Sequence, residues 1–286
     1  MLLVADSGST KCDWLLSQSG KEDGKFSTIG FNPYFRNTES IEAEIRNNEE
    51  LCDVAPSIDQ LYFYGAGINS KEMQDVLHSA LQSIFINADL VVDHDLIGSV
   101  YATCGDNPGI SCILGTGSNA CYYDGTSVYQ AVPSLSYILG DEASGSYFGK
   151  KLIAGYLYKE LPAEIHKSFV AEFGLTKEEI FEAVYRKPNA NVYLASYSKF
   201  LGKHKEHAWV GDMIFNGFNT FINTHIAKYE NHQEVPVHFV GSLAVHFQDI
   251  LRSACEVHGI TVGKIIKKPV SNLLTYHWNE LCQKQY

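Results

Sequence analysis

The stretch Val4–Trp14, VADSGSTKCDW, has a near copy at Ile113–Tyr123, ILGTGSNACYY. Each stretch begins with an apolar run, turns through small residues around a glycine and a serine, and resumes with a cysteine and an aromatic residue. An apolar run, a glycine-containing turn and a second apolar run predict a β-hairpin. Two matching hairpins this far apart predict a duplicated domain, because the repeats of a solenoid have shorter periods.

Between the two hairpins the chain alternates short apolar runs with helical patterns. Gln60–Gly65 and Ala88–Asp93 are bounded by turn residues and predict buried strands, whereas Ser70–Phe85 and Leu96–Cys104 have apolar residues at helical spacing. Strands that alternate with helices are typical of the α/β class.

The second half is richer in helical patterns. Thr176 and Glu179 have the spacing of a capping box, which predicts a helix start. No low-complexity linker interrupts the chain, so we expect the two domains to pack across a cleft. The expected elements are helices over Ser144–Leu161, Val192–Leu201, Trp209–Tyr229 and Leu243–His258, and a strand over Val235–Gly241.

Length and charge exclude several classes of protein. The chain has 286 residues, which suggests two domains at about 150 residues each. Its formal net charge of −11 argues against a nucleic-acid partner, because binding a phosphate backbone requires a basic face. No apolar run approaches the roughly 18 residues of a membrane span, and Met1–Asp6 lacks the basic start of a signal peptide. We therefore expect a cytoplasmic protein without a membrane partner.

Seven cysteines are present, and no two of them have CxxC spacing. An odd number in a chain of this size makes a disulfide framework or a structural zinc site unexpected. We expect most of them to be reduced, buried, small apolar residues.

The turn of the first hairpin, Asp6–Lys11, has the residues of a phosphate cradle. Small residues let backbone N–H groups face an anion, and the side chains of Ser9, Thr10 and Lys11 would add donors. Asp6 could hold Mg²⁺ through water, since that ion retains much of its hydration. An ordinary polar hairpin with a solvated lysine would have the same pattern.

The turn of the second hairpin, Leu114–Asn119, is chemically similar. Two such turns facing one cleft would hold the phosphate chain of ATP from both sides.

Asp93 and Asp95 follow an apolar strand and precede a predicted helix. A carboxylate in this place could accept a proton from an attacking hydroxyl, a contribution of roughly 10²–10⁴ in rate. An acid before a helix also caps unpaired N–H groups, so the two residues could divide these roles.

Two further segments complete the set. Asp141 and Glu142 lie within Leu139–Gly145, where they could bind sugar hydroxyls or a hydrated metal, or could simply cap the next helix. In Val240–Ala244 a Gly-Ser turn joins a strand to a helix, which would let a flat ring or a phosphate approach the backbone.

In chain order these five segments resemble the motifs of the superfamily of sugar kinases, Hsp70 and actin: a phosphate-1 hairpin, a catalytic acid, a phosphate-2 hairpin and an adenosine motif. The more specific resemblance is to BadF/BadG/BcrA/BcrD-type ATPases, in the branch that contains N-acetylglucosamine kinase. Leu139–Glu142 matches the L-G-D-E signature of that branch, and Asp95–Ser99 matches its D-x-x-G-S segment, which favours Asp95 over Asp93. The motifs run from residue 1 to about residue 245.

This resemblance implies an α/β fold of two duplicated, ribonuclease H-like (actin-like ATPase) domains, with mixed sheets flanked by helices and an interdomain cleft. Residues 1–105 would form the first domain and residues 106–286 the second, with the last helix returning to the first domain.

The activity implied by the resemblance is ATP-dependent phosphorylation of an amino-sugar hydroxyl. N-acetylglucosamine or a related cell-wall N-acetylhexosamine would be the substrate, with ATP and Mg²⁺ as cofactors and Asp95 as the general base. The residues that it assigns are Asp95 for catalysis; Gly8, Ser9, Thr10, Lys11, Gly115, Thr116, Gly117, Gly241 and Ser242 for ATP; Asn32, Ser118, Asn119, Asp141 and Glu142 for the sugar; and Asp6 for the metal.

The chain departs from the family pattern in three places. Pro133–Tyr137 replaces a Gly-Gly-Trp-Gly stretch, which puts the identity of the sugar in question. Ala143 replaces the glycine after the acid pair, and Pro269–Leu274 lacks the small-residue pattern of the returning helix. We therefore expect the C-terminal edge of the nucleotide pocket to differ.

Two alternatives remain open at the level of sequence. One is a nucleotide-gated regulatory or binding protein that transfers no phosphate. The other is a dehydratase-activating ATPase, whose iron–sulfur cluster needs paired thiolates on loops; only Cys104 and Cys112 are near one another outside a motif. A homodimer is the expected assembly, since dimers are the commonest oligomers.

Overall fold

A computed structural model describes residues 1–8 and 10–283 of the chain. The chain divides into two compact units. Unit 1 comprises Met1–Asp106 together with the C-terminal segment that begins at Lys268, and unit 2 comprises Asn107–Lys267.

Unit 1 is built on a mixed sheet of five strands in the order β3 (Gly24–Ile29), β2 (Lys11–Ser17), β1 (Leu2–Ser7), β4 (Gln60–Gly65) and β5 (Asp89–His94). β1, β2 and β3 are antiparallel neighbours, and β4 and β5 continue the sheet parallel to β1. The predicted first hairpin is therefore confirmed as β1 and β2.

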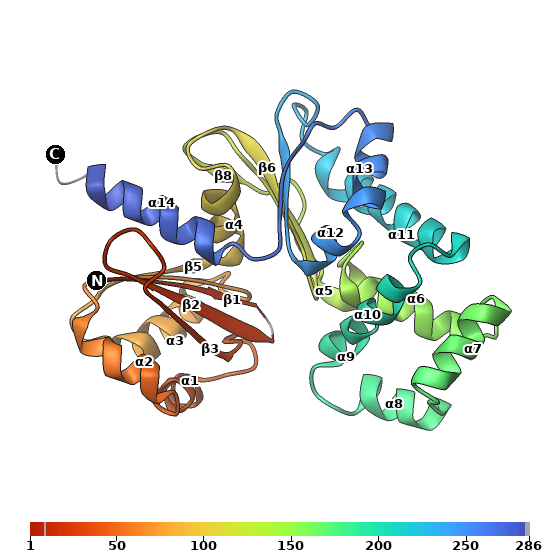
Figure 1. Cartoon of the computed structure of the whole chain (residues 1–286), viewed down its shortest axis with the longest axis horizontal. Coiled ribbons are helices and arrows are strands. Elements are labelled where there is room, and N and C mark those ends of the chain that lie inside the picture. The colour runs from red at the N-terminus through yellow and green to blue at the C-terminus, as the bar shows by residue number, and fades with distance from the viewer. Residues whose placement is uncertain (9, 284–286) are drawn as a thin grey trace. The chain divides into compact units, whose positions relative to one another are not determined.

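Helices cover both faces of this sheet (Figure 1). One face carries α1 (Thr38–Arg46), α2 (Glu49–Val54) and α3 (Lys71–Gln82), and the other carries α4 (Asp95–Thr103) and α14 (Val270–Gln283). A short 3₁₀ helix, Ala55–Ser57, follows α2. Because both faces are covered, the central strand β1 is almost wholly apolar and buried.

The C-terminal helix α14 is held on unit 1 by a buried aromatic cluster. Nε2 of His277 lies 2.8 Å from Oη of Tyr64, and the imidazole stacks on Tyr62 with a centroid distance of 3.7 Å. Both tyrosines project from β4, so α14 covers the strand that lies between β1 and β5.

Unit 2 repeats the topology of unit 1. Its strands lie in the order β8 (Val128–Tyr129), β7 (Ser118–Tyr123), β6 (Gly109–Leu114), β9 (Val237–Val240) and β10 (Val262–Ile266). β6, β7 and β8 are antiparallel neighbours, and β9 and β10 are parallel to β6. The identical order and directions confirm the predicted duplication and the α/β fold class.

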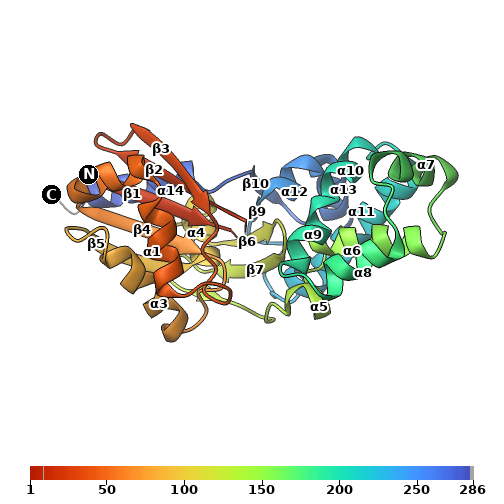
Figure 2. The same cartoon turned by 90° about the horizontal axis from the view of Figure 1, so that it is seen from below.

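A helical insertion between β8 and β9 explains why the second half of the sequence is richer in helical patterns. Figure 2 shows the inserted helices α7 to α10 beside α6, away from strands β6, β7 and β9. The elements between β8 and β9 are α5 (Ser136–Leu139), α6 (Gly145–Leu157), α7 (Ala163–Glu172), α8 (Lys177–Tyr185), α9 (Ala190–Ser196), α10 (Ser198–Lys203), α11 (Ala208–Phe221) and a π-helix (Ile222–Ile226). The capping box predicted at Thr176 and Glu179 is confirmed at the start of α8.

Two long helices predicted from periodicity are each broken in the structure. The helix predicted over Val192–Leu201 is divided into α9 and α10, and the one over Leu243–His258 is divided at Phe247 into α12 (Ser242–His246) and α13 (Gln248–Val257). Phe247 leaves helical geometry to bury its ring in the core, and the apolar spacing continues across the break. Periodicity alone therefore could not reveal the change in direction.

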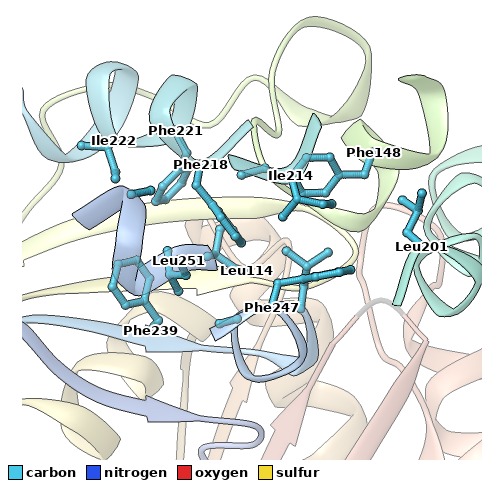
Figure 3. Packing of buried hydrophobic residues seen from close by; sticks show 14 of the residues in the cluster. Leu114, Phe148, Leu201, Ile214, Phe218, Phe221, Ile222, Phe239, Phe247 and Leu251 are labelled. Carbon is cyan, nitrogen blue, oxygen red and sulfur yellow. The ribbon is translucent and has the colours of Figure 1, made fainter. Parts of the chain in front are cut away.

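The core of unit 2 joins the sheet to the inserted helices (Figure 3). Leu114 of β6 and Phe239 of β9 pack with Phe218 of α11 and Phe247, and all four are at least 97% buried. This packing fixes the carboxyl ends of β6 and β9, which precede the predicted turns at Gly115 and Gly241.

In residues 1–8 and 10–283, no helix combines the length and the apolarity needed to cross a membrane.

Substituting Gly149 tests the packing of α6 on α9. A Cβ atom at Gly149 would overlap the carbonyl of Leu194, so Gly149→Ala should lower the free energy of unfolding by about 1–3 kcal/mol. Gly211, inside α11, is the matched control because its Cβ would lie 3.6 Å from the nearest atom, the carbonyl oxygen of Lys205. Gly211→Ala should raise stability by about 0.5–1 kcal/mol. Chemical denaturation measures both, and equal effects would contradict the close helix contact.

Candidate active site

The predicted site residues of unit 1 gather at one edge of its sheet. β1, β4 and β5 are parallel, and their last residues, Ser7, Gly65 and His94, lie side by side in the register. Segments that follow parallel strands therefore meet at this edge, which is the usual ligand-binding edge of an α/β sheet. They are the turn of the first hairpin and the start of α4 at Asp95.

The turn of the first hairpin is closed by its own backbone. The N–H of Gly8 donates to the carbonyl of Lys11 at 3.0 Å, so this amide is not available to a phosphate as the small-residue pattern predicted. Thr10 and Lys11 are exposed, and Ser9 lies outside the described residues. Within the described part of the turn, Thr10 and Lys11 are the predicted donors that remain accessible.

Asp6 and Asp13 stand directly opposite each other on β1 and β2. Two like charges in this position destabilise a sheet, and the charge of Asp13 is balanced by two lysines. Nζ of Lys11 lies 2.9 Å from Oδ1 of Asp13, and Nζ of Lys268 lies 2.6 Å from Oδ2. Burial raises the pKa of Asp13, but the hydrogen bonds from Lys268 and Lys11 outweigh it and hold this pKa below its ordinary value.

Asp6 has no such balance. Among the described residues its carboxylate makes no hydrogen bond or ion pair. Burial, followed by the negative charges of Asp95 and Asp13, raises the pKa of Asp6 to about 7, and Lys268 offsets only part of this effect. Asp6 is therefore partly protonated near neutral pH.

An unpaired carboxylate beside a phosphate-type turn fits a hydrated Mg²⁺, which prefers oxygen ligands and keeps several waters. In the described residues no three side chains of the metal-binding types come together. Asp6 would therefore offer such an ion a single carboxylate, with water among its other ligands.

Asp95 begins α4, but the side chain that caps this helix is that of His94. Nδ1 of His94 accepts the N–H of Leu96 at 3.1 Å, whereas the carboxylate of Asp93 accepts the N–H of His94 at 2.7 Å. The alternative in which an acid caps α4 is therefore wrong. The side chain of Asp95 is 21% exposed, and its Oδ1 lies 2.8 Å from Nδ1 of His94.

The glycine of the D-x-x-G-S segment has a packing role. A Cβ atom on Gly98 would lie 2.7 Å from the ring of Tyr64, so only glycine lets α4 lie this close to β4. Ser99 is buried and its hydroxyl donates to the carbonyl of Leu96 at 2.7 Å. Both residues fix the first turn of α4, which carries Asp95.

Asn32 is placed at the same edge of unit 1 as Asp6. The hydroxyl of Ser7 accepts the N–H of Phe31 at 2.8 Å, which ties the Asn32 loop to the end of β1. Gly67, with φ +84°, lies under the carboxamide, and a Cβ there would be 2.5 Å from Oδ1 of Asn32. The carboxamide oxygen also accepts the N–H of Tyr34 at 3.0 Å, so the donor end of Asn32 remains for a ligand.

In unit 2 the second hairpin has the same kind of turn. The N–H of Gly115 donates to the carbonyl of Gly117 at 3.0 Å, so it too closes the turn. The amides of Thr116 and Gly117 have no acceptor among the described residues, which leaves two adjacent N–H groups for an anion.

Asp141 is braced against this turn. Its Oδ1 accepts the N–H of Ser118 at 3.2 Å, and a Cβ on Gly117 would lie 2.8 Å from Oδ2. Burial raises the pKa of Asp141 more than the Ser118 amide lowers it. Asn119 does not join this group: consecutive strand residues point to opposite faces, and its Oδ1 accepts the side chain of Gln130 at 2.7 Å.

Glu142 is paired with a histidine that the sequence did not single out. Its Oε2 lies 3.0 Å from Nε2 of His225, which is 4% exposed and belongs to the π-helix after α11. Nδ1 of His225 has no partner among the described residues. Asp141 and Ala143, on either side of Glu142, both have φ +56°. This is the left-handed region of the backbone, which glycine adopts more easily than alanine does. The conformation at Ala143 is therefore one that a glycine would adopt more easily.

Gly241 connects the adenosine-type turn to the second hairpin. Its φ is +132°, and a Cβ atom there would overlap the carbonyl of Leu114, the last residue of β6. Ser242 follows as the exposed first residue of α12. The predicted residues at 115–117, 141 and 241–242 are thus gathered at one edge of unit 2.

Lys268 and His94 are the residues of unit 1 that sequence reasoning missed. Lys268 is distant in sequence from Asp13 and directly precedes Pro269 and α14. His94 lies between Asp93 and Asp95, and its position before a helix start was the available signal.

Cys104 and Cys112, on which the iron–sulfur alternative depends, are both buried.

Neutralising the two opposed aspartates should change stability in opposite directions. The folded state holds the proton of Asp6 more tightly than the unfolded chain does, so this group costs stability as pH rises towards about 7. Asp6→Asn should therefore raise Tm, and by more at pH 8 than at pH 5. The lowered pKa of Asp13 has the opposite sign, so Asp13→Asn should lower Tm at both pH 8 and pH 5, because this stability is lost only when the pH falls below the ordinary pKa of an aspartate. Calorimetry at both pH values checks this, and shifts of the same sign would contradict the assignment.

Three solved structures show what this chain is similar to. A candidate N-acetylglucosamine kinase from Porphyromonas gingivalis is 38% identical, with a TM-score of 0.92, over 98% of this chain and 100% of that chain. A candidate N-acetylglucosamine kinase from Chromobacterium violaceum is 16% identical with a TM-score of 0.75, over 96% and 98% of the two chains. A ROK-family glucokinase from Streptomyces griseus, in complex with glucose and AMPPNP, is 12% identical with a TM-score of 0.53, over 96% and 97%.

The two more distant likenesses concern the fold alone, which is the actin-like ATPase fold. No family model and no curated protein sequence matches this chain. An identity of 38% over 98% of this chain and all of that chain shows the relationship directly. The protein belongs to the same family as the Porphyromonas gingivalis protein, within the actin-like superfamily of sugar kinases.

Proposed function

We propose that this protein is an ATP-dependent kinase that phosphorylates a hydroxyl of an amino sugar, with N-acetylglucosamine or a related N-acetylhexosamine as the substrate. The observation that carries the proposal is Asp95, a half-buried carboxylate at the start of α4, at the same sheet edge as Asp6 and the first phosphate-type turn. The relationship to a candidate N-acetylglucosamine kinase indicates the substrate class. Membership in the BadF/BadG-type group is a further proposal, supported by the L-G-D-E and D-x-x-G-S motifs.

Asp95 would act as the general base. Its Oδ1 faces His94, which leaves Oδ2 to accept the hydroxyl proton of the sugar. The place of Asp95 in the first turn of α4 and its contact with His94 hold the carboxylate in a fixed direction. A positioned base of this kind contributes roughly 10²–10⁴ in rate.

Each hairpin turn would offer donors to phosphate groups of ATP. Unit 1 offers Thr10 and Lys11, and unit 2 offers the adjacent amides of Thr116 and Gly117. Gly241, without a side chain, would let the nucleotide approach the backbone beside Leu114. A Mg²⁺ held through water by Asp6 would neutralise charge on the phosphates. Phosphoryl transfer needs mainly this positioning and charge neutralisation.

The sugar would be recognised by polar groups that the structure holds in place. Asn32 is fixed by Tyr34 and Gly67, and Asp141 is fixed by the amide of Ser118. Glu142, directed by His225, is a further acceptor for sugar hydroxyls. Leu135, Ile138 and Leu139, in and after the segment that replaces Gly-Gly-Trp-Gly, are exposed, so this region offers an apolar surface in place of a tryptophan.

A coupled assay of ADP release tests the proposal. Wild-type protein with Mg·ATP would be compared across N-acetylglucosamine, N-acetylmuramic acid, N-acetylmannosamine, glucosamine and glucose. We expect stimulation by an N-acetylated sugar and a loss of about 10²–10⁴ in kcat for Asp95→Asn. Asp93→Asn is the matched control, because Asp93 ends the same strand and faces the backbone N–H of His94; it should retain activity within about tenfold.

The other outcomes separate the alternatives. ATP binding without stimulation by any sugar would favour a regulatory ATPase. A larger loss for Asp93→Asn than for Asp95→Asn would reverse the assignment of the base. No binding of ATP would contradict the proposed function as a whole.

A further inference from the structure

Nδ1 of His94 has two contacts that require different protonation states. The N–H of Leu96 points at this nitrogen from 3.1 Å, which requires a free lone pair on Nδ1. Oδ1 of Asp95 lies 2.8 Å from the same nitrogen, which requires a proton between them. A single nitrogen cannot satisfy both contacts at once.

The two contacts therefore correspond to two states of the pair. In the first state His94 is neutral, with its proton on Nε2, and Nδ1 accepts the N–H of Leu96. In the second state one more proton has entered the pair and lies between Nδ1 and Oδ1 of Asp95. Both partners already lie within hydrogen-bond distance of Nδ1.

We propose that His94 receives, on Nδ1, the proton that Asp95 removes from the sugar hydroxyl, so that Asp95 is ionised again when the phosphorylated sugar leaves. This proposal rests on the proposed kinase function. As the O–H bond of the sugar breaks, its oxygen forms a bond to the γ-phosphorus, and the bond from that phosphorus to the β,γ-bridging oxygen breaks with its electron pair leaving on ADP. The proton passes to Asp95, then to His94, and finally to solvent through the imidazole, which is 25% exposed.

The surroundings of His94 favour this transfer. The acids that face it are Asp95 on α4 and Asp93 on β5. Burial lowers the pKa of His94, but the hydrogen bond and charge of Asp95, together with the charge of Asp93, outweigh burial and raise it above its ordinary value. His94 does not touch the sugar in this scheme and acts through Asp95, so it is a positioning and proton-accepting residue.

His94→Asn separates this role from helix capping. Asparagine is among the best N-cap residues and retains an acceptor for Leu96 N–H, but it cannot take up a proton. We expect kcat at pH 8 to fall about tenfold while the KM for the sugar changes less than about twofold. The acid limb of kcat/KM, which in the wild type follows protonation of His94, should move to lower pH by about one unit. A profile parallel to that of the wild type would overturn the proposal and leave His94 as a cap.

NMR titration of the His94 imidazole provides a readout that does not depend on turnover. The signal is assigned by its loss in His94→Asn, and its pKa is compared between the wild type and Asp95→Asn. We expect the pKa to fall in Asp95→Asn, because the carboxylate that stabilises the imidazolium is gone. An unchanged pKa with an active wild type overturns the proton transfer alone. The expected fall with no sugar-dependent activity contradicts the kinase function, and the transfer with it.

Discussion

Crowding of carboxylates at one edge of the first sheet is the constraint on which the rest of unit 1 depends. Burial, followed by the charges of Asp95 and Asp13, raises the pKa of Asp6, and the three carboxylates have different partners. Asp13 is balanced by Lys11 and Lys268, and Asp95 lies against His94. Asp6 alone has no partner among the described residues, and its pKa is raised to about 7. A fold that keeps an unpaired acid at a cost is consistent with a cationic ligand that binds only during function.

The two units have the same topology but different chemistry at their hairpin turns. Unit 1 combines its hairpin turn with charged side chains, whereas unit 2 relies on backbone. There, Gly117 makes room for Asp141, Gly241 lies against the end of β6, and the Thr116 and Gly117 amides remain available. Unit 2 also holds Asp141 in a left-handed conformation, which is a strained backbone of the kind that functional sites retain. The two units therefore share one strand order and differ in the side chains and backbone groups at this edge.

Much of the fold could be predicted because the signals for it are local. The matching hairpins identified the duplication, and the strand predicted at Gln60–Gly65 coincides with β4. What escaped prediction depends on contacts between distant segments. Lys268 reaches Asp13 only when the last helix returns to unit 1, and His225 reaches Glu142 only through a π-helical turn. The break at Phe247 was invisible because apolar spacing continues through it.

For the site residues too, local motifs were predictive, whereas the directions and partners of side chains were not. Motifs placed Asp95 and Gly241 at strand ends, where the structure has them, but Asp141, predicted at a strand end, lies between the helices α5 and α6. The motif alone did not separate Ser118 from Asn119, although consecutive strand residues point to opposite faces and Asn119 accepts the side chain of Gln130. Nor could composition tell which side chain caps α4, since aspartate is the commoner N-cap residue and His94 is the cap here.

The most direct test of the central claim is ³¹P NMR of wild-type protein with Mg·ATP and N-acetylglucosamine. Our account predicts a new phosphomonoester signal coupled to a sugar proton, and the appearance of ADP with inorganic phosphate alone would contradict it.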